Sequence, residues 1–417
     1  MRIDNDNGDR GTVPASVLVV GASASGLTTV EALRRTGYAG AVTVLGDEPH
    51  PPYDRPPLSK QVLSGAWEPG RAELRTAEVL SDLNADFCLG DRATALHVPT
   101  RTVRTESGRE LRADAIVIAT GVRARTLPGQ EPLAGVHVLR SLDDALALRE
   151  DLRTATRLVV VGEGVLGSEI AATARTLGLD VTLTGPLAAP MALQVGPLVS
   201  EALAELHTER GVRLRLGAGV AGLTGERGRV TGVALGTGEV LPADVVVVAI
   251  GASPATDWLT DSGLELDNGV VCDSRSRAED GIYAVGDVAR FHHEHLGRLV
   301  RLENRTNATE QAIAVAADIL GEGRPYLPVP YFWTDQFDAK LQVHGFLPPD
   351  AEADVVEGDL SARRFVVRYR SEGRVTGVLG WNMPKQTRLR RQEVVDALPR
   401  PDATRAGAPL FASTPTH

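Results

Sequence analysis

Short apolar runs followed by glycine-rich turns recur along the chain and predict buried parallel strands. Ser16–Val20 (SVLVV) is almost wholly apolar and rich in β-branched residues, which is typical of a parallel strand covered on both faces. The next apolar positions, Leu27, Val30 and Leu33, recur every three residues and predict a helix that ends near Gly37. A second strand follows in AVTVLGDE. The segment therefore predicts a strand, a glycine turn, a helix and a second strand.

This unit occurs twice in the chain. The second copy consists of RLVVV, GEGVLG, SEIAATARTLGL and VTLTG. Two further apolar runs, Ala115–Gly121 (AIVIATG) and Val245–Pro254 (VVVVAIGASP), end in small-residue turns and predict additional buried strands. From Pro328 onward the segments are short and alternating, which predicts an antiparallel sheet. The expected fold class is α/β, with two Rossmann-like dinucleotide-binding domains and a C-terminal α+β domain.

The glycine turn of the first copy, GASASG, has the chemistry of a diphosphate site. Gly21 permits the tight turn, and Gly26 allows the helix to pack closely on the strand, so that the first N–H groups of the helix point at an anion. Asp47 lies 21 residues after Gly26, at the end of the second strand, where an acid can hold a ribose 2′-hydroxyl. Ser23 stands where a second glycine is usual. A glycine-rich turn alone also occurs without a ligand, but this context predicts a dinucleotide-binding unit.

The second copy keeps all three glycines, Gly162, Gly164 and Gly167. Its second strand ends at Gly185, with neither the acid that selects NAD nor an arginine for NADP. Its nucleotide preference therefore stays open. A third candidate is Asp287, in a glycine turn before an expected helical stretch, where the carboxylate either accepts a hydrogen bond from a sugar hydroxyl or caps the helix.

Length, charge and cysteine content exclude several kinds of partner and site. The chain has 417 residues, enough for two to four domains, and a formal charge of −10 makes nucleic acid an unexpected partner. The sequence contains no run of 18 apolar residues and therefore predicts no membrane span. The polar N-terminal residues lack the pattern of a secretory signal. The two cysteines, Cys88 and Cys272, are far apart, which excludes a CxxC redox pair and a cysteine-ligated metal centre. We expect a cytoplasmic protein without a metal site.

Four segments together are similar to one known family. GDEPHPPYDRPPLSK (Gly46–Lys60), AVGDVARF, RLENRTNATEQA and FWTDQFDAKLQVHG resemble the oxygenase-coupled ferredoxin reductases of the putidaredoxin reductase and rhodocoxin reductase type. The resemblance extends from about Ser16 to about Leu398. It implies FAD as the prosthetic group, NAD(P)H as the electron donor and an iron–sulfur ferredoxin as the acceptor.

The resemblance also implies the domain order and the binding residues. The FAD domain would comprise residues 15–120 and 251–327, the NAD(P)-type domain 121–250 and the C-terminal domain 328–405, with flexible tails at 1–14 and 406–417. The ADP half of FAD would contact Gly21, Ser23, Ser25, Gly26 and Asp47. The rest of FAD would contact Arg55, Lys60, Ala93, Ala119, Thr120, Gly121, Arg140, Gly286, Asp287, Glu303, Asn304 and Arg305. The nicotinamide cofactor would contact Gly162, Gly164, Gly167 and Glu169.

Lys60 is a candidate for a catalytic role because an ammonium group near the flavin stabilises the negative charge of the reduced ring. The chain has only three lysines among its 44 basic residues, so a lysine inside a motif is informative. We predict that Glu169 is the counter-ion of Lys60 and that the two side chains touch across the two dinucleotide units. The alternative is a solvated lysine after a proline turn.

Three residues depart from the family pattern. Gly185 replaces the usual acid, Val165 replaces an aromatic residue that lies over the flavin in many relatives, and Arg305 replaces an apolar or aromatic residue beside the flavin. Together they suggest an open flavin face with a guanidinium beside it, suited to a small anion. Arg305 could equally be paired with a neighbour such as Glu303.

Two charged clusters need separate interpretations. His292, His293 and His295 (HHEH) lack a spaced fourth ligand, and we expect a solvated loop rather than a metal site. The densest basic cluster either docks an acidic ferredoxin or is a solvated helix face. It contains Lys385, Arg388, Arg390 and Arg391.

The leading expectation is an FAD-dependent NAD(P)H:ferredoxin reductase that serves a cytochrome P450 or a similar oxygenase. One alternative is a flavin-dependent oxidoreductase that acts directly on a small anionic metabolite, with weak or no use of NADH. A third is a flavoprotein whose redox state controls partner binding. The sequence leaves the oligomeric state and the choice between NADH and NADPH open.

Overall fold

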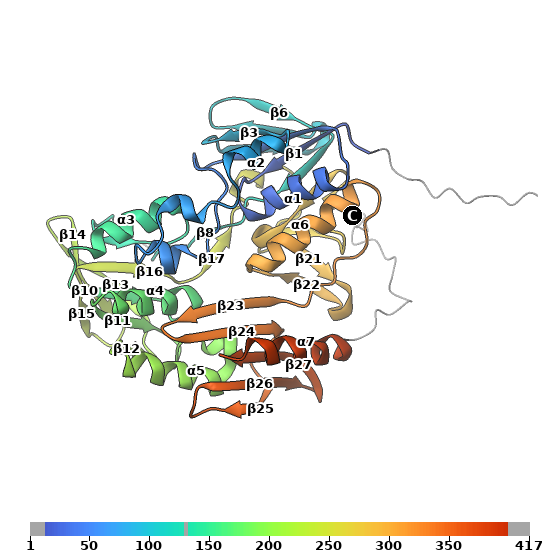
Figure 1. Cartoon of the computed structure of the whole chain (residues 1–417). Helices are drawn as coiled ribbons and strands as arrows, with labels where there is room; N and C mark the ends of the chain where they lie inside the picture. Colours follow the sequence, from blue (N-terminus) through green and yellow to red (C-terminus); the bar gives the residue numbers. More distant parts are fainter. Residues whose placement is uncertain (1–12, 129–131, 399–417) are drawn as a thin grey trace, which may run out of the picture.

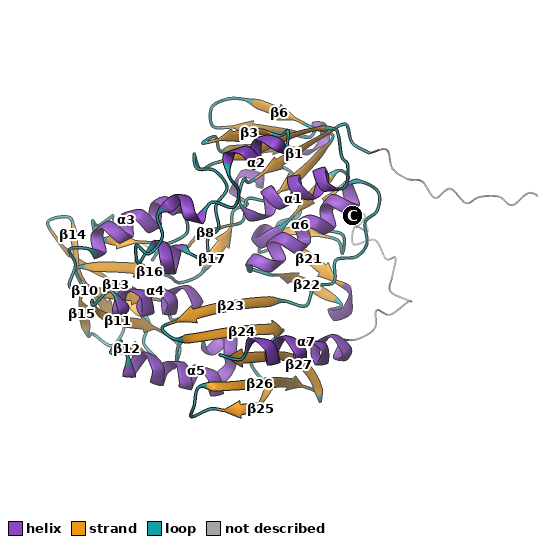
Figure 2. Ribbon diagram, viewed as in Figure 1, coloured by secondary structure: helices purple, strands orange, loops and turns teal. Residues whose placement is uncertain are grey.

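The structure is a computed structural model that describes residues 13–128 and 132–398. Two parallel sheets with covering helices lie above and beside a C-terminal antiparallel sheet (Figure 1). Figure 2 shows the same arrangement by secondary structure, with the helices packed against the sheet faces. The expected α/β class with an added α+β part is confirmed.

The first parallel unit is a six-stranded sheet, parallel except for its edge strand β19, and it is assembled from two separate segments of the chain. Its order is β19-β20-β7-β1-β2-β3. The strands are β1 (Ser16–Val20), β2 (Ala41–Gly46), β3 (Asp86–Leu89), β7 (Ala115–Ile118), β19 (Arg277–Glu279) and β20 (Ile282–Ala284). On one face α1 (Ala24–Arg35) and α6 (Arg305–Ile319) share a core with the sheet, to which Val17, Val30 and Val315 contribute. The helix predicted after the first glycine turn is therefore confirmed, and the chain turns at Gly37 with a φ of 86°.

Smaller elements complete this part of the chain. A three-stranded sheet contains β4 (Ala93–His97), β5 (Thr102–Thr105) and β6 (Glu110–Arg112), and another contains β18 (Val270–Cys272), β21 (Ala289–His293) and β22 (Arg298–Arg301). The short helices are η1 (Leu58–Val62), η2 (Pro69–Ala72), α2 (Ala77–Asp82), η3 (Val98–Thr100), η4 (Asp257–Leu259), η5 (Gly286–Val288) and η6 (Glu294–Leu296). A two-stranded ribbon of β8 (Val122–Ala124) and β17 (Ala252–Pro254) lies where the chain leaves and re-enters the first unit.

The second parallel unit repeats the first. Its sheet has the order β12-β11-β10-β16-β9, with β9 (Val136–His137), β10 (Arg157–Val161), β11 (Asp180–Gly185), β12 (Arg213–Leu216) and β16 (Val245–Val248). The covering helices are α3 (Leu142–Leu152), α4 (Val165–Thr176) and α5 (Ala192–Glu209). The opposite face is covered by the antiparallel strands β13 (Val220–Glu226), β14 (Arg229–Leu235) and β15 (Val240–Pro242). The two predicted copies therefore form equivalent strand–turn–helix–strand units.

The C-terminal part is the predicted antiparallel sheet, with the order β23-β24-β27-β26-β25. Its strands are β23 (Tyr331–Gln336), β24 (Ala339–Gly345), β25 (Glu352–Asp359), β26 (Arg364–Ser371) and β27 (Arg374–Trp381), followed by α7 (Pro384–Ala397). Trp381, Phe365 and Tyr369 are fully buried in a core shared with α5. Because this core includes α5, the sheet is fixed against the second parallel unit.

Two local expectations are wrong. The turn that contains Asp287 leads into strand β21 rather than into a helix, so Asp287 caps no following helix. The expected solvated loop of histidines is also wrong, because His292 and His293 belong to β21 and His293 is buried, with Nε2 hydrogen-bonded to the Pro328 carbonyl oxygen at 3.1 Å. Almost all of the predicted tails, 1–14 and 406–417, lie outside the described residues. The domain boundaries stay predictions.

Candidate functional site

The backbone around the first glycine turn is packed so closely that a side chain on either Gly21 or Gly26 would collide with it. A Cβ atom on Gly26 would lie 1.8 Å from the Gly21 carbonyl oxygen, and one on Gly21 would lie 2.2 Å from the Ala119 carbonyl oxygen. Ser23 is the residue before α1 and makes no side-chain cap, so the first N–H groups of the helix stay available to a ligand. The contacts fit a diphosphate group at this helix start.

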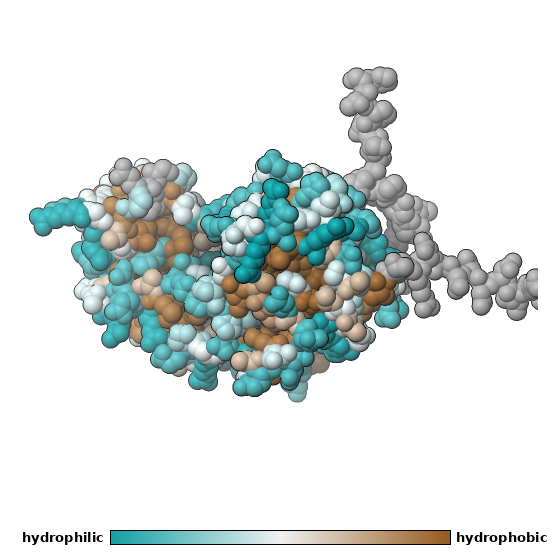
Figure 3. Space-filling view, turned by 90° about the horizontal axis from the view of Figure 1, so that it is seen from above, coloured by the Kyte–Doolittle hydropathy of each residue, from teal (hydrophilic) through white to brown (hydrophobic). Residues whose placement is uncertain are grey.

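A single cavity gathers many of the residues predicted to hold FAD. It lies at the carboxyl ends of β1 and β2, which is where doubly wound sheets bind ligands. Seen from above in Figure 3, the outline of the molecule is notched between a smaller and a larger lobe. The cavity is lined by the predicted residues Gly21, Ser23, Asp47, Arg55, Ala93, Ala119, Thr120 and Arg140, and also by Glu48, Tyr53 and Trp258.

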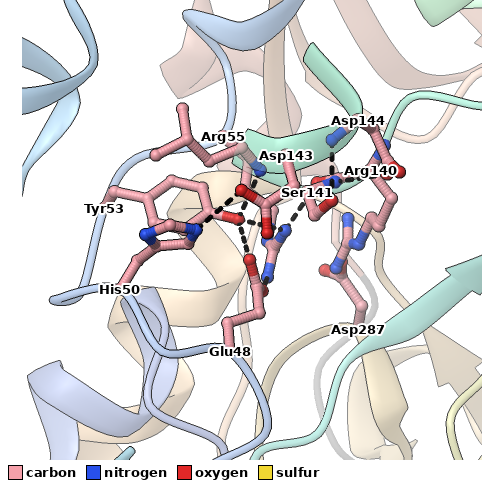
Figure 4. Close-up of polar contacts among 10 residues, drawn as sticks. Glu48, His50, Tyr53, Arg55, Arg140, Ser141, Asp143, Asp144 and Asp287 are labelled. Carbon is pink, nitrogen blue, oxygen red and sulfur yellow. Dashed lines mark hydrogen bonds and ion pairs between the residues drawn. The ribbon is translucent and has the colours of Figure 1, made fainter. Parts of the chain in front are cut away.

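A network of polar contacts forms one wall of this cavity (Figure 4). Arg55 donates to Glu48 Oε1 at 2.7 Å and to the Arg140 carbonyl oxygen at 2.5 Å. The Tyr53 hydroxyl donates to Glu48 Oε2 and accepts a hydrogen bond from the Leu142 N–H at 2.9 Å. Sequence reasoning missed Glu48 and Tyr53, although both lie inside the segment Gly46–Lys60. They fix the position of Arg55 and of the turn before α3.

Arg140 and Asp287 meet at the inner end of the network. Arg140 Nη2 lies 3.3 Å from Asp287 Oδ2, and Arg140 Nε is buried without a partner among the described residues. Burial and, next, the positive charge of Arg55 lower the pKa of Arg140. A buried guanidinium N–H without a partner is costly, so this site fits an anionic or oxygen-rich ligand.

The remaining predicted FAD residues do not line this cavity. A Cβ atom on Gly286 would lie 3.0 Å from Ser25 Oγ, so the turn with Asp287 packs on the start of α1. A Cβ atom on Gly121 would lie 3.0 Å from Arg140 Nη2, so Gly121 lies against the Arg140 guanidinium. Asn304 caps α6 by accepting from the Asn307 N–H at 2.8 Å, and Glu303 precedes it and pairs with Arg301. Whether these residues contact FAD stays a prediction.

The contact predicted between Lys60 and Glu169 is confirmed. Lys60 Nζ lies 2.7 Å from Glu169 Oε2, and both side chains are largely buried. Ser59 Oγ donates to the same carboxylate oxygen at 2.5 Å, and Thr334 Oγ1 on β23 donates to Oε1 at 2.9 Å. Glu169 on α4 therefore joins η1, the second parallel unit and the C-terminal sheet. The alternative of a solvated lysine is wrong.

Arg305 is paired, but not with the neighbour expected from the sequence. Its Nε donates to Asp54 Oδ1 at 2.6 Å and its Nη1 to Thr309 Oγ1. The alternative that Arg305 is paired is therefore confirmed, but its partner is Asp54, and Glu303 pairs with Arg301 instead. With its donors directed at Asp54 and Thr309, Arg305 is not the free cation that an anionic substrate would need.

The second glycine turn has the same geometry as the first. A Cβ atom on Gly167 would lie 1.8 Å from the Gly162 carbonyl oxygen, whereas one on Gly164 would meet nothing within 4 Å. Gly164 therefore leaves room for a pyrophosphate. Val165, the first residue of α4, packs against the core of the C-terminal sheet. Sequence reasoning missed Glu163, whose carboxylate lies over Gly185.

The basic cluster lies on α7, as the helix-face interpretation expected. Arg390 is bound to Glu357 at 3.1 Å and to Glu393 at 2.8 Å. Lys385, Arg388 and Arg391 are exposed, and so is Leu389, at 66%. Three of the four predicted cations therefore face solvent, and the fourth holds the helix to β25.

Both cysteines are free, and no pair stands beside the candidate flavin site. Cys88 is partly buried on β3, and Cys272 is buried on β18, where desolvation raises the pKa of its thiol. Within residues 13–128 and 132–398, no helix is long and apolar enough to cross a membrane.

Comparison with known proteins decides the family. The family described as pyridine nucleotide-disulphide oxidoreductase matches residues 15–312, and the one described as reductase C-terminal matches residues 331–411. The chain belongs to the pyridine nucleotide-disulphide oxidoreductase family. This bears out the resemblance noted in the sequence.

Within this family, the chain is similar to ferredoxin reductases over nearly its whole length. It is 35% identical over 386 residues to rhodocoxin reductase of Rhodococcus erythropolis, covering 92% of this chain and 90% of the relative. It is 35% identical over 391 residues to putidaredoxin reductase CamA of Pseudomonas putida, covering 92% of both chains. The ferredoxin reductase for the CYP199A2 system of Rhodopseudomonas palustris has a similar structure, with a TM-score of 0.89, 32% identity and coverage of 94% and 98%.

Proposed function

We propose that this oxidoreductase passes electrons from NAD(P)H through FAD to an iron–sulfur ferredoxin, which then serves a cytochrome P450 or a related oxygenase. The observation that carries the proposal is the Lys60–Glu169 pair, which joins the FAD-type and nicotinamide-type units at 2.7 Å. A flavin held between two such units would accept a hydride and release electrons singly.

The residues of the chain contribute binding, orientation and charge. The helix starts after Gly21 and Gly162 present N–H groups to the two diphosphates. Lys60 supplies a positive charge near the place where negative charge develops on reduction, and Glu169 prevents that ammonium from being buried alone. No protein nucleophile is required, which agrees with two cysteines that are free and far apart.

The acceptor would dock on α7. Lys385, Arg388 and Arg391 present positive charge on a chain whose formal charge is −10, and exposed Leu389 adds an apolar contact. Such a patch attracts an acidic partner and fixes its orientation. The similarity to the ferredoxin reductase for the CYP199A2 system and to putidaredoxin reductase supports this choice of partner.

The alternative, direct action on a small anionic metabolite, is not favoured. It required a free guanidinium at Arg305, and that group is bound to Asp54 and Thr309. The cytoplasmic setting belongs to the proposal and is supported by the free thiols of Cys88 and Cys272.

An anaerobic experiment tests the proposal. The purified protein with bound FAD is mixed with one equivalent of NADH or NADPH, and bleaching of the flavin absorbance is followed. Fast bleaching with one of them, followed by ferredoxin-dependent reduction of a cytochrome, is expected. Slow or absent bleaching with both nucleotides would overturn the proposal.

A further inference from the structure

The carboxylate of Glu163 lies at the end of β11, where the sequence lacks the usual acid. Glu163 lies in the second glycine turn, directly after β10, and Val161 of β10 is paired with Thr184 of β11. A Cβ atom on Gly185 would lie 1.6 Å from Glu163 Oε2 and 2.3 Å from Cδ. A side chain at residue 185 would therefore require the carboxylate of Glu163 to move from its present position.

The position of Glu163 accounts for the glycine, in place of an acid, at residue 185. Gly185 has no positive φ, so its backbone would accept an ordinary side chain if Glu163 were absent. Gly185 leaves the space that the carboxylate of Glu163 occupies, and this carboxylate comes from the turn after the adjacent strand β10. Whether the acid is at the strand end itself or is Glu163, a carboxylate lies at the carboxyl edge of β11. At this edge, an acid of a dinucleotide-binding unit binds ribose hydroxyls.

The carboxylate of Glu163 is also short of partners. Glu163 is 4% exposed, and Oε1 accepts a hydrogen bond from the Leu187 N–H at 2.7 Å. In the part of the chain that the structure describes, no protein group donates to Oε2. Two carboxylate oxygens offer about four acceptor positions, so a buried carboxylate with one donor is suited to further donors. The hydroxyls of a ribose are such donors.

The segment after β11 offers no positive charge for a phosphate. Residues 186–191 (PLAAPM) contain neither lysine nor arginine. A 2′-phosphate at this strand end would lie against the carboxylate of Glu163 without a cation from that segment. Like charges at such short range are unfavourable.

We infer that Glu163 is the specificity-determining residue of the nicotinamide site and that it selects NADH over NADPH by binding the adenosine ribose. The inference rests on the proposed function, because it requires the nicotinamide cofactor to bind at the second glycine turn. The choice between NADH and NADPH, which the sequence left open at Gly185, would thus be made by Glu163.

Binding of cofactor fragments gives a test that is independent of turnover. The affinities of ADP-ribose and 2′-phospho-ADP-ribose are measured by calorimetry for the protein with FAD bound. The unsubstituted protein should bind ADP-ribose at least tenfold more tightly. Glu163→Gln keeps an oxygen acceptor for the Leu187 N–H but removes the charge, and it should weaken ADP-ribose binding about tenfold. The difference between the two fragments should shrink accordingly.

A matched control and a rescue separate recognition from folding. Asp180→Asn removes a carboxylate from the opposite end of β11 and should leave the fragment preference as it is. Glu163→Ala should lose the preference, and Glu163→Ala with Gly185→Glu should regain it, because the acid then returns at the strand end without a collision. A preference that survives in Glu163→Gln, or a failed rescue in a folded double variant, overturns the inference.

Reduction of the flavin separates this inference from the proposed function. Reduced nicotinamide mononucleotide lacks the adenosine half, so the effect of Glu163→Gln on flavin bleaching should appear with NADH and vanish with the mononucleotide. An equal loss with both donors shows a structural defect and overturns the inference alone. If the unsubstituted protein is reduced rapidly but prefers NADPH, the inference fails while the proposed function stands. If neither nucleotide reduces the flavin, both fail.

Discussion

Lys60 Nζ lies 2.7 Å from Glu169 Oε2, and this ion pair joins two segments that are 109 residues apart in the sequence. Glu169 also accepts hydrogen bonds from Ser59 and Thr334, so three parts of the chain meet at one carboxylate.

Lys60→Met should be strongly destabilising because it leaves a buried carboxylate without its counter-ion. We expect a loss of about 3 kcal/mol in the free energy of unfolding, measured with urea. Lys60→Met combined with Glu169→Gln should lose less than the sum of the single variants. A purely additive pair would contradict a coupled ion pair. The midpoint potential of bound FAD should also fall in Lys60→Met, because a positive charge near the reduced ring is removed.

Gly26→Ala and Gly167→Ala form a matched pair, since a Cβ at either position would lie 1.8 Å from a backbone oxygen of its own glycine turn. Gly26→Ala should lose FAD during purification, seen as a fall in the ratio of absorbance at the flavin band to that of the protein. Gly167→Ala should keep FAD but be reduced by NADH at least tenfold more slowly. Loss of FAD from both variants would show that the two turns do not serve separate cofactors.

Charge reversal on α7 should weaken ferredoxin transfer without changing flavin reduction. Lys385→Glu with Arg388→Glu should raise the KM for ferredoxin about tenfold at low salt, and less at high salt, because screening already weakens the attraction. Arg112→Glu, at an exposed position of β6, is the control and should change neither constant. If the α7 double variant and Arg112→Glu raised the KM for ferredoxin equally, ferredoxin would not dock on α7.

The stability should fall in mild acid partly because of His344. Burial and, next, the positive charge of Arg391 lower the pKa of His344 to about 4. Its folded pKa is thus below the usual value of 6.5, and the unfolded chain binds the proton first as the pH falls. The contribution of neutral His344 is therefore complete above pH 6.5 and is lost between pH 6.5 and 4. His344→Phe, which keeps a ring beside Tyr331, should show a smaller loss of Tm over this range than the unsubstituted protein.

The features that the sequence predicted well are local or repeated. The strand, glycine turn and helix at Ser16–Arg35 follow from residues adjacent in the chain, and the copy at Arg157–Thr176 obeys the same rules. The Lys60–Glu169 contact was predictable because the family resemblance placed both residues beside the cofactors and because a buried ammonium needs a counter-ion.

The features that it missed depend on side chains that meet only after folding. Arg305 and Asp54 are 251 residues apart, and no periodicity relates them. Glu163 reaches over Gly185 from the turn after the neighbouring strand β10, which a linear motif does not show. The burial of His293 did leave a signal, because Phe291 and His293 alternate with Arg290 and His292 and so share one face of β21.

The scarcity of lysine makes the surface unusually simple for amine-directed coupling. Lys60 is held in its ion pair, which leaves Lys340 and Lys385 as the exposed lysine amines. A zero-length carbodiimide reagent that joins amines to carboxylates would therefore capture an acidic partner on α7 through Lys385, and replacing that one residue by arginine would keep the charge while abolishing the crosslink.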